Sequence, residues 1–209
     1  MVDADVVAAI FGSCPELTSL NLSECDVGAA ALLPAVRALA DDGTAPRLAL
    51  EVVDLQGNPR LGGETFALLT RCCPRLRELA FGYCCSEEPL DSGEARVLTD
   101  QDLSSLEGCA CASGLRTLKL GAMGRRSGDN NPTVGRAAFG TRGIRSLAGA
   151  VPSLQILDLA HSVADNPTVC AVAKACPELQ RLNVASTRCT REVHRMLREF
   201  GSEARVFGA

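Results

Sequence analysis

Short stretches in which apolar residues alternate with polar ones recur along the chain. Variants of the phrase L-x-x-L-x-L-x-x-(C/N/S/T) occur six times, and their L-x-L core has the period of two that is typical of a β-strand. The phrases begin 33, 26, 39, 39 and 25 residues apart, which indicates one repeated unit that carries insertions in some copies. They are LTSLNLSEC (17–25), LEVVDLQGN (50–58), LRELAFGYC (76–84), LRTLKLGAM (115–123), LQILDLAHS (154–162) and LQRLNVAST (179–187).

The residues that follow each phrase are spaced as in an amphipathic helix. Each unit is therefore expected to be a strand, a turn, a helix and a return, and one such unit buries its apolar face only against its neighbours. The pattern predicts an α/β fold: a curved solenoid of about six repeats, with a parallel sheet on the concave side and helices on the convex side. The helix positions are Ala31, Leu32, Val36 and Leu39; Phe66, Leu68 and Leu69; Leu103 and Leu106; Ile144 and Leu147; Val169, Val172 and Ala173; and Val193, Met196 and Leu197.

The two ends of the chain carry incomplete units. A helical pattern without a strand before it lies near the start, in DVVAAIF, and a short apolar stretch, ARVF, lies at 204–207. We expect a single domain over 1–209, with an N-terminal helical cap at 1–13, six repeats at 14–200 and a C-terminal cap strand at 201–209.

Cysteines occupy recurring places in the units. Cys14, Cys73 and Cys176 each precede a proline, and because proline cannot continue a helix, Cys-Pro is expected to end one helix and direct the chain into the next strand. Cys25 and Cys84 follow their strands by three residues. We expect these two small side chains to pack under the turn, with the weak S–H donor facing backbone carbonyls.

The units resemble leucine-rich repeats, and more narrowly the cysteine-containing subtype of F-box substrate receptors. The stretches Thr99-Asp100-Gln101-Asp102-Leu103 and Thr141-Arg142-Gly143-Ile144 resemble the helix starts of that subtype. Asn58 stands where the subtype has cysteine, so the second unit looks more like the ribonuclease-inhibitor type. The resemblance covers roughly residues 10–200 and implies a leucine-rich-repeat scaffold for protein recognition in a ubiquitin-ligase-like assembly.

Charge and composition narrow the classes of function. A net charge of −4 argues against a general nucleic-acid binder, and no run approaches the ~20 apolar residues of a membrane span, so no membrane insertion is expected. The acidic N-terminus MVDADVVAAIF lacks the basic region of a secretory signal. Eleven cysteines without such a signal favour free thiols in an intracellular, reducing compartment, and the cytoplasm is expected.

Cysteine and histidine are the residue types from which a zinc site, a nucleophilic dyad or a reactive thiol could be built. Zinc sites favour pairs of cysteines with two to four residues between them, and the close pairs here, such as Cys72-Cys73, lack that spacing. A nucleophilic dyad requires a histidine, and His161 and His194 are expected in a turn and on a wet helix face. The sequence therefore predicts no enzyme, cofactor or metal; a thiol-dependent enzyme, the rival hypothesis, would need one fast-reacting thiol of low pKa.

The strand residues between the apolar positions are expected to face the concave surface and to be available to a partner. Two insertions offer a second surface: the acidic segment 85–98 and the basic segment 124–140, which would lie side by side on one rim. The candidate partner-binding residues are Asn21, Asp54, Glu78, Lys119, Asp158, Arg181 and Asn183 on the strands, and Glu87, Glu88, Arg125, Arg126 and Arg136 in the insertions.

These observations favour a non-catalytic protein–protein interaction module. A structural subunit or assembly factor of a large multiprotein complex is the alternative. The sequence leaves open which protein is bound, and whether the concave surface or the two insertions bind it.

Overall fold

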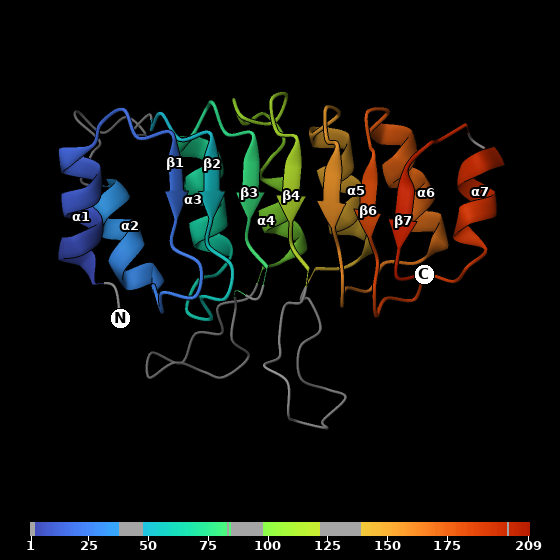
Figure 1. Cartoon of the computed structure of the whole chain (residues 1–209), viewed down its shortest axis with the longest axis horizontal. Helices are drawn as coiled ribbons and strands as arrows, with labels where there is room; N and C mark the ends of the chain where they lie inside the picture. The colour runs from blue at the N-terminus through green and yellow to red at the C-terminus, as the bar shows by residue number, and fades with distance from the viewer. Residues whose placement is uncertain (1–2, 38–47, 83, 85–97, 122–138, 200) are drawn as a thin grey trace, which may run out of the picture.

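The computed structural model describes residues 3–37, 48–82, 84, 98–121, 139–199 and 201–209. Its strands form one parallel sheet, in which each strand lies beside the next one in the sequence (Figure 1). This order confirms the predicted solenoid, because every unit adds one strand to the edge of the growing sheet. The strands are β1 (Ser19–Asn21), β2 (Val52–Asp54), β3 (Glu78–Ala80), β4 (Thr117–Lys119), β5 (Ile156–Asp158), β6 (Arg181–Asn183) and β7 (Arg205–Phe207).

The helices form a second layer behind the sheet, as Figure 1 shows, and leave the other side of the strands uncovered by helices. We call this uncovered side the open face; it is the surface that the sequence predicts to be concave. Among the described residues, no helix is both long and apolar enough to cross a lipid bilayer. The helices are α1 (Ala4–Ser13), α2 (Ala29–Arg37), α3 (Gly63–Cys72), α4 (Asp100–Ser104), α5 (Thr141–Ala150), α6 (Asn166–Ala175) and α7 (Val193–Glu199).

The core lies between the two layers and is built mainly from aliphatic side chains. The central residue of every strand points toward the helices and is buried, and the strands are aligned so that these residues form one continuous row. At about 1.5–3 kcal/mol for each buried side chain of this size, the row provides much of the cohesion between repeats. It consists of Leu20, Val53, Leu79, Leu118, Leu157, Leu182 and Val206.

The Cys-Pro pairs end helices, as predicted. Cys14, Cys73 and Cys176 are the C-terminal caps of α1, α3 and α6, and each cap N–H donates to the carbonyl four residues earlier. The cap carbonyl then accepts from the leucine three residues later, at 3.1, 3.1 and 3.0 Å, which closes the turn into the next strand. Val151, followed by Pro152, makes the same turn after α5, so the proline and the tight turn define this corner more than the cysteine does.

The predicted cysteine and asparagine positions after the strands link neighbouring repeats. The Cys84 thiol donates to the carbonyl of Leu55 in the preceding repeat at 3.0 Å. Asn58, one repeat earlier, donates to the Leu22 carbonyl at 2.8 Å and accepts the Val27 N–H at 2.9 Å. The two residue types thus occupy equivalent places and both reach back to the preceding repeat.

The helix starts that the sequence indicated also connect repeats. Thr99 caps α4 in a capping box with Asp102, which satisfies backbone donors at the start of a short helix. The carboxylate of Asp100 accepts the backbone N–H of Gly140 at 2.6 Å and of Gly143 at 3.0 Å, both at the start of α5 in the next repeat. A Cβ atom at Gly143 would lie 2.9 Å from the Asp100 Cα, so glycine permits this close approach.

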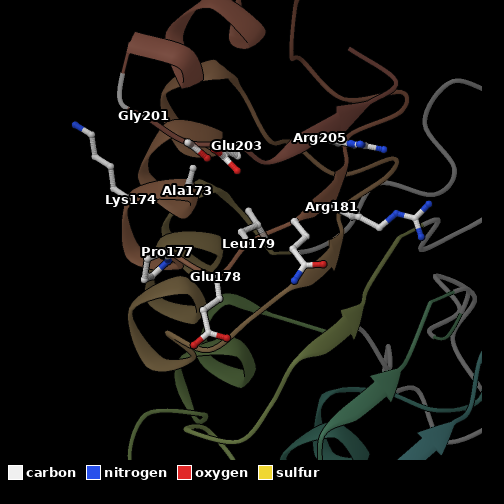
Figure 2. Close-up of a pocket in the computed structure, with 11 residues that line it drawn as sticks. Ala173, Lys174, Pro177, Glu178, Leu179, Arg181, Gly201, Glu203 and Arg205 are labelled. Atoms are coloured by element: carbon white, nitrogen blue, oxygen red, sulfur yellow. The ribbon is translucent and has the colours of Figure 1, made fainter.

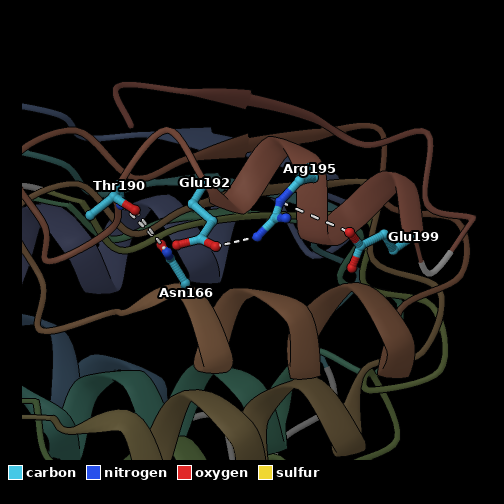
Figure 3. A network of polar contacts seen from close by, with 5 residues as sticks. All are labelled: Asn166, Thr190, Glu192, Arg195 and Glu199. Atoms are coloured by element: carbon cyan, nitrogen blue, oxygen red, sulfur yellow. Dashed lines mark hydrogen bonds and ion pairs between the residues drawn. The ribbon is translucent and has the colours of Figure 1, made fainter.

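Helix α7 is tied to the repeat before it by polar contacts (Figure 3). The Asn166 side chain, at the start of α6, donates to the Thr190 hydroxyl and accepts the Thr190 N–H, both at 2.9 Å. Arg195 forms ion pairs with Glu192 and Glu199 along α7. A helix, α1, precedes the first strand and a strand, β7, follows the last helix; that these elements act as caps stays a prediction.

Candidate functional site

The open face presents two rows of side chains in register across the sheet. Strand pairing aligns the first residue of every strand in an outer row and the third residue in a middle row. The predicted strand residues therefore do lie on one surface, spread along its length. The outer row is Ser19, Val52, Glu78, Thr117, Ile156, Arg181 and Arg205, and the middle row is Asn21, Asp54, Ala80, Lys119, Asp158, Asn183 and Phe207.

Four polar residues of the middle row have a local structural role. Asn21, Asp54, Asp158 and Asn183 each accept, through the side-chain oxygen, the backbone N–H two residues later, at 2.9, 3.1, 2.9 and 3.1 Å. Such Asx turns bend the chain away from the strand. Partner binding by these four residues stays a prediction; their turn role was not predicted, although the recurrence of Asn or Asp at one place in the repeat was a signal for it.

The middle row departs from this rule at β3, β4 and β7, where Ala80, Lys119 and Phe207 stand in place of Asn or Asp. The glycines that follow β3 and β4 lie so close together that a Cβ atom at Gly82 would be 2.6 Å from the Gly121 carbonyl oxygen. The Lys119 side chain makes no turn bond and is half-buried. It is thus a charged group of the open face with no part in closing its own repeat.

A hollow of about 270 Å³ lies on the open face over β4 to β7. It brings together four of the seven predicted strand residues and three apolar residues that were not predicted. Phe207 is 46% exposed and is one of two large apolar side chains that stand out from the described surface. The hollow is lined by Lys119, Ile156, Leu157, Asp158, Arg181, Asn183 and Phe207.

The hollow is rich in cationic groups at its C-terminal end. The Arg181 guanidinium lies over the Phe207 ring, with 5.7 Å between its central carbon and the ring centroid, which is within the range of a cation–π contact. Arg205 is the register partner of Arg181 and is exposed. In the described part of the chain, no carboxylate forms an ion pair with Arg181, Arg205 or Lys119.

A larger groove, of about 890 Å³, opens beside the hollow where the last turn enters β7 (Figure 2). The groove coincides with a departure from the repeat pattern. Three residues before the central residue of β1 to β6 stands a leucine, such as the buried Leu154 and Leu179, whereas the same place before β7 is taken by the exposed Glu203. With no leucine to fill the corner, the turn after α7 stands apart from the turn after α6, and Arg181 borders both the groove and the hollow.

Comparison with solved structures identifies the architecture. A chain in the crystal structure of the Rad7 and Elc1 complex in yeast superposes with a TM-score of 0.71 at 17% sequence identity, covering 100% of this chain and 44% of that one. The superposition covers all the parallel strand–helix units that carry the L-x-x-L-x-L phrase in this chain. The chain has a leucine-rich-repeat fold.

A second solved structure is less similar to this leucine-rich-repeat chain. The leucine-rich repeat-containing protein LegL7 from Legionella pneumophila aligns with a TM-score of 0.43 at 13% identity, over 86% of this chain and 51% of that one, which is too low to support an argument. The chain thus spans about half, or less, of both matched structures. Searches with family models and among curated proteins found no match.

The leucine-rich-repeat scaffold does not bring all predicted site residues together. Asn21, Asp54 and Glu78 lie on β1 to β3, outside the hollow. The insertion residues Glu87, Glu88, Arg125, Arg126 and Arg136, and the proposed rim of 85–98 and 124–140 except for its ends, lie outside the described residues.

Three residues of this surface were not among the predicted partner-binding residues: Ile156, Arg205 and Phe207. Extending the repeat register by one strand into ARVF would have placed Arg205 beside Arg181 and Phe207 beside Asn183. The signal was therefore present in the sequence. Because the stretch was interpreted only as a cap strand, its side chains were not counted among the partner-binding residues.

The buried thiols of the leucine-rich repeats have the chemistry of core side chains. Burial, together with the neighbouring thiols of Cys72 and Cys111, raises the pKa of Cys73 to about 12, and burial raises that of Cys176 to about 11. A raised pKa keeps a thiol protonated and slow to react. His161 is an exposed turn residue with a φ of 61°, and within the described ranges no group of three or more His, Cys, Asp and Glu residues is arranged to hold a metal ion.

Proposed function

We propose that this leucine-rich-repeat chain is a non-catalytic protein-interaction module whose partner docks on the open face over β4 to β7. The observation that carries the proposal is the hollow, in which the exposed Phe207, the arginine over its ring and Lys119 meet on paired strands. Aromatic side chains and arginine are enriched in protein–protein interfaces relative to the rest of a protein surface.

Rigidity of the sheet supports the same proposal. The residues of the hollow project from paired strands whose central residues are buried, so their positions are fixed before a partner arrives. Groups fixed in advance lose little conformational entropy on binding. A surface of this kind favours a partner segment that adapts to it.

The finer assignment that we propose is recognition of a protein within a ubiquitin-ligase-like assembly. Its support is the resemblance of the Cys-Pro repeats to those of F-box substrate receptors. The fold likeness to a chain from the Rad7 and Elc1 complex is compatible with a role in a multiprotein assembly, although that likeness extends only to the fold and to 44% of the matched chain.

A site-specific crosslinking experiment in the native cell tests the docking surface. A photoreactive amino acid replaces the exposed ring in a Phe207→p-benzoylphenylalanine variant, and a matched variant carries it at Arg142, an exposed residue of α5 in the helix layer. The proposal expects one or a few proteins to be crosslinked from position 207 and not from position 142.

Two results would contradict this proposal. Crosslinks from position 142 alone would move the docking surface to the helices. A particle of fixed composition that resists high salt, with neither position crosslinked, would favour a structural subunit over a recognition module.

A further inference from the structure

Two arginines occupy neighbouring places at the C-terminal end of the open face. Arg181 on β6 and Arg205 on β7 are register partners, which sets their backbones about 5 Å apart. Figure 2 shows both side chains extending toward the same side, away from Lys174 and Glu178. Like charges directly opposite each other on adjacent strands destabilise the pairing of the strands. An anion that contacts both guanidinium groups would relieve this repulsion.

The described residues of this chain do not supply that anion. Its ion pairs involve other arginines, such as Arg37 with Glu64 and Arg77 with Glu51. Arg181 is instead stacked on an aromatic ring, which orients its guanidinium and leaves N–H donors for another group. An oriented guanidinium loses less freedom when it binds a carboxylate through two parallel hydrogen bonds.

The surroundings of the pair are positive, although the protein as a whole is negative. The hollow itself holds Lys119 and Arg181 against the single carboxylate of Asp158, a formal excess of one positive charge in a chain of net charge −4, and Arg205 lies beside Arg181. Asp158 already accepts the Ala160 N–H and is the register partner of Lys119. An acidic ligand thus meets a local field of the opposite sign.

The hollow also limits which ligand side chain can lie next to the ligand's acidic group. Ile156 and Phe207 give it an apolar surface beside the arginines, and its volume of about 270 Å³ has room for one aliphatic or aromatic side chain. On the other side of the pair, the groove is lined by charged side chains of both signs, Glu178, Glu203 and Lys174. The two sides of the arginine pair therefore differ, because one is apolar and the other is polar.

We infer that the partner of this chain presents an acidic peptide segment. An Asp or Glu carboxylate is held between Arg181 and Arg205, and an adjacent apolar side chain enters the hollow between Ile156 and Phe207. This inference rests on the proposed function, since it names the chemistry of the partner at that same surface.

The test uses the full chain and a displayed library of random short peptides as the probe. Peptides enriched by the wild type are synthesised, and their affinities are measured by fluorescence anisotropy for the wild type, for R181Q/R205Q and for F207A. The matched control is R75Q, which removes the charge of an exposed arginine in the turn before β3. Far-UV circular dichroism and unfolding midpoints establish that each variant is folded.

We expect the enriched peptides to share an Asp or Glu beside an apolar residue. R181Q/R205Q should bind them at least ten-fold more weakly, because charge-assisted hydrogen bonds are lost, and R75Q should bind them like the wild type. Replacing the peptide's Asp or Glu by Asn or Gln should weaken binding similarly, and added salt should weaken the wild-type complex because exposed charges are screened.

Three results would overturn the inference, each in a recognisable way. Peptides that lose affinity for F207A but not for R181Q/R205Q would show an apolar docking site and leave the proposed function intact. A labelled single-stranded oligonucleotide that binds more tightly than the peptides, and depends on both arginines, would assign the pair to phosphate. Peptides insensitive to all the open-face variants would refute both the inference and the docking surface.

Discussion

Replacement of Asn58 provides a test of how one repeat is joined to the next. This side chain is fully buried and lies in the turn after β2. It accepts the Val27 N–H at 2.9 Å and donates to the carbonyls of Leu22 and Leu55, both at 2.8 Å. Two of these three bonds cross from the second repeat to the first, so the residue couples the two units.

The expected loss of stability follows from the buried backbone groups that Asn58→Ala leaves without partners. Asn58→Ala leaves a buried N–H without its acceptor, at a cost of about 1–3 kcal/mol, and two carbonyls without a donor. Together with the small cavity, we expect the free energy of unfolding to fall by about 3–5 kcal/mol, a large part of the ~5–15 kcal/mol of an ordinary domain. Asn58→Cys should lose less, because a thiol can donate to the Leu22 carbonyl as Cys84 does to Leu55.

Urea unfolding measures the loss, and amide hydrogen exchange locates it. The matched control is Asn21→Ala on β1, where an exposed side chain makes a turn within its own repeat, and where we expect a loss of about 1 kcal/mol or less. Because solenoid stability is nearly a sum over neighbouring repeats, protection should fall at Val27 and persist in β5 and β6. A loss for Asn58→Ala no larger than that of the control would refute the reasoning.

Three further predictions concern thiols, a helix cap and a glycine. Ellman's reagent should label the exposed Cys14 promptly in the folded chain but label Cys73, whose pKa is raised to about 12, only as the chain unfolds; equal rates in the two would contradict the packing. Asp165→Ala should cost about 1 kcal/mol at neutral pH because it removes the α6 cap. Since a hydrogen bond from Thr168 lowers the pKa of this carboxyl in the folded state, its stabilisation is present above the unfolded pKa of about 4 and is lost below it, so urea midpoints of wild type and variant should converge in acid. Gly143→Ala should destabilise the chain by about 1–3 kcal/mol through collision with Asp100, which a thermal melt would detect; a gain in stability, as helix propensity alone suggests, would show that the approach is not tight.

The fold was largely predictable because each repeat has its apolar residues at the same spacing. Leucines at fixed spacing must all face one interior, and a one-residue shift in any strand would turn its leucines outward, so six copies determine the register of the sheet. Cys-Pro marked the corners for a physical reason that the structure confirms at Cys14, Cys73 and Cys176. The exact partners of Asn58 and Asp100 could not be predicted, because they lie in neighbouring repeats and depend on how closely two turns approach.

The candidate site was only partly predictable, for a reason that concerns exposure. A polar residue on a strand that faces solvent is equally compatible with binding a partner and with holding its own turn, and sequence spacing does not separate these roles. The structure separates them for Asn21 and Asp54, whose oxygens accept turn amides, and for Arg181, whose donors face the hollow. The hollow itself depends on β7, whose contribution becomes visible only when the strand is placed beside β6.

Some polar groups of the open face already form hydrogen bonds or ion pairs and others do not. This difference indicates where docking of a partner would release the most free energy. On the N-terminal half of the open face, Asp54 accepts hydrogen bonds from Gln56, and Glu51 beside β2 pairs with Arg77. A partner docking there would compete with bonds that the chain already makes, and would gain little net energy. On the C-terminal half, Arg181 and Arg205 have no carboxylate partner among the described residues, and Phe207 is exposed. Burying these three groups against a complementary surface would form new contacts without breaking ion pairs of the described residues, and this supports the proposal that the partner docks on the C-terminal half.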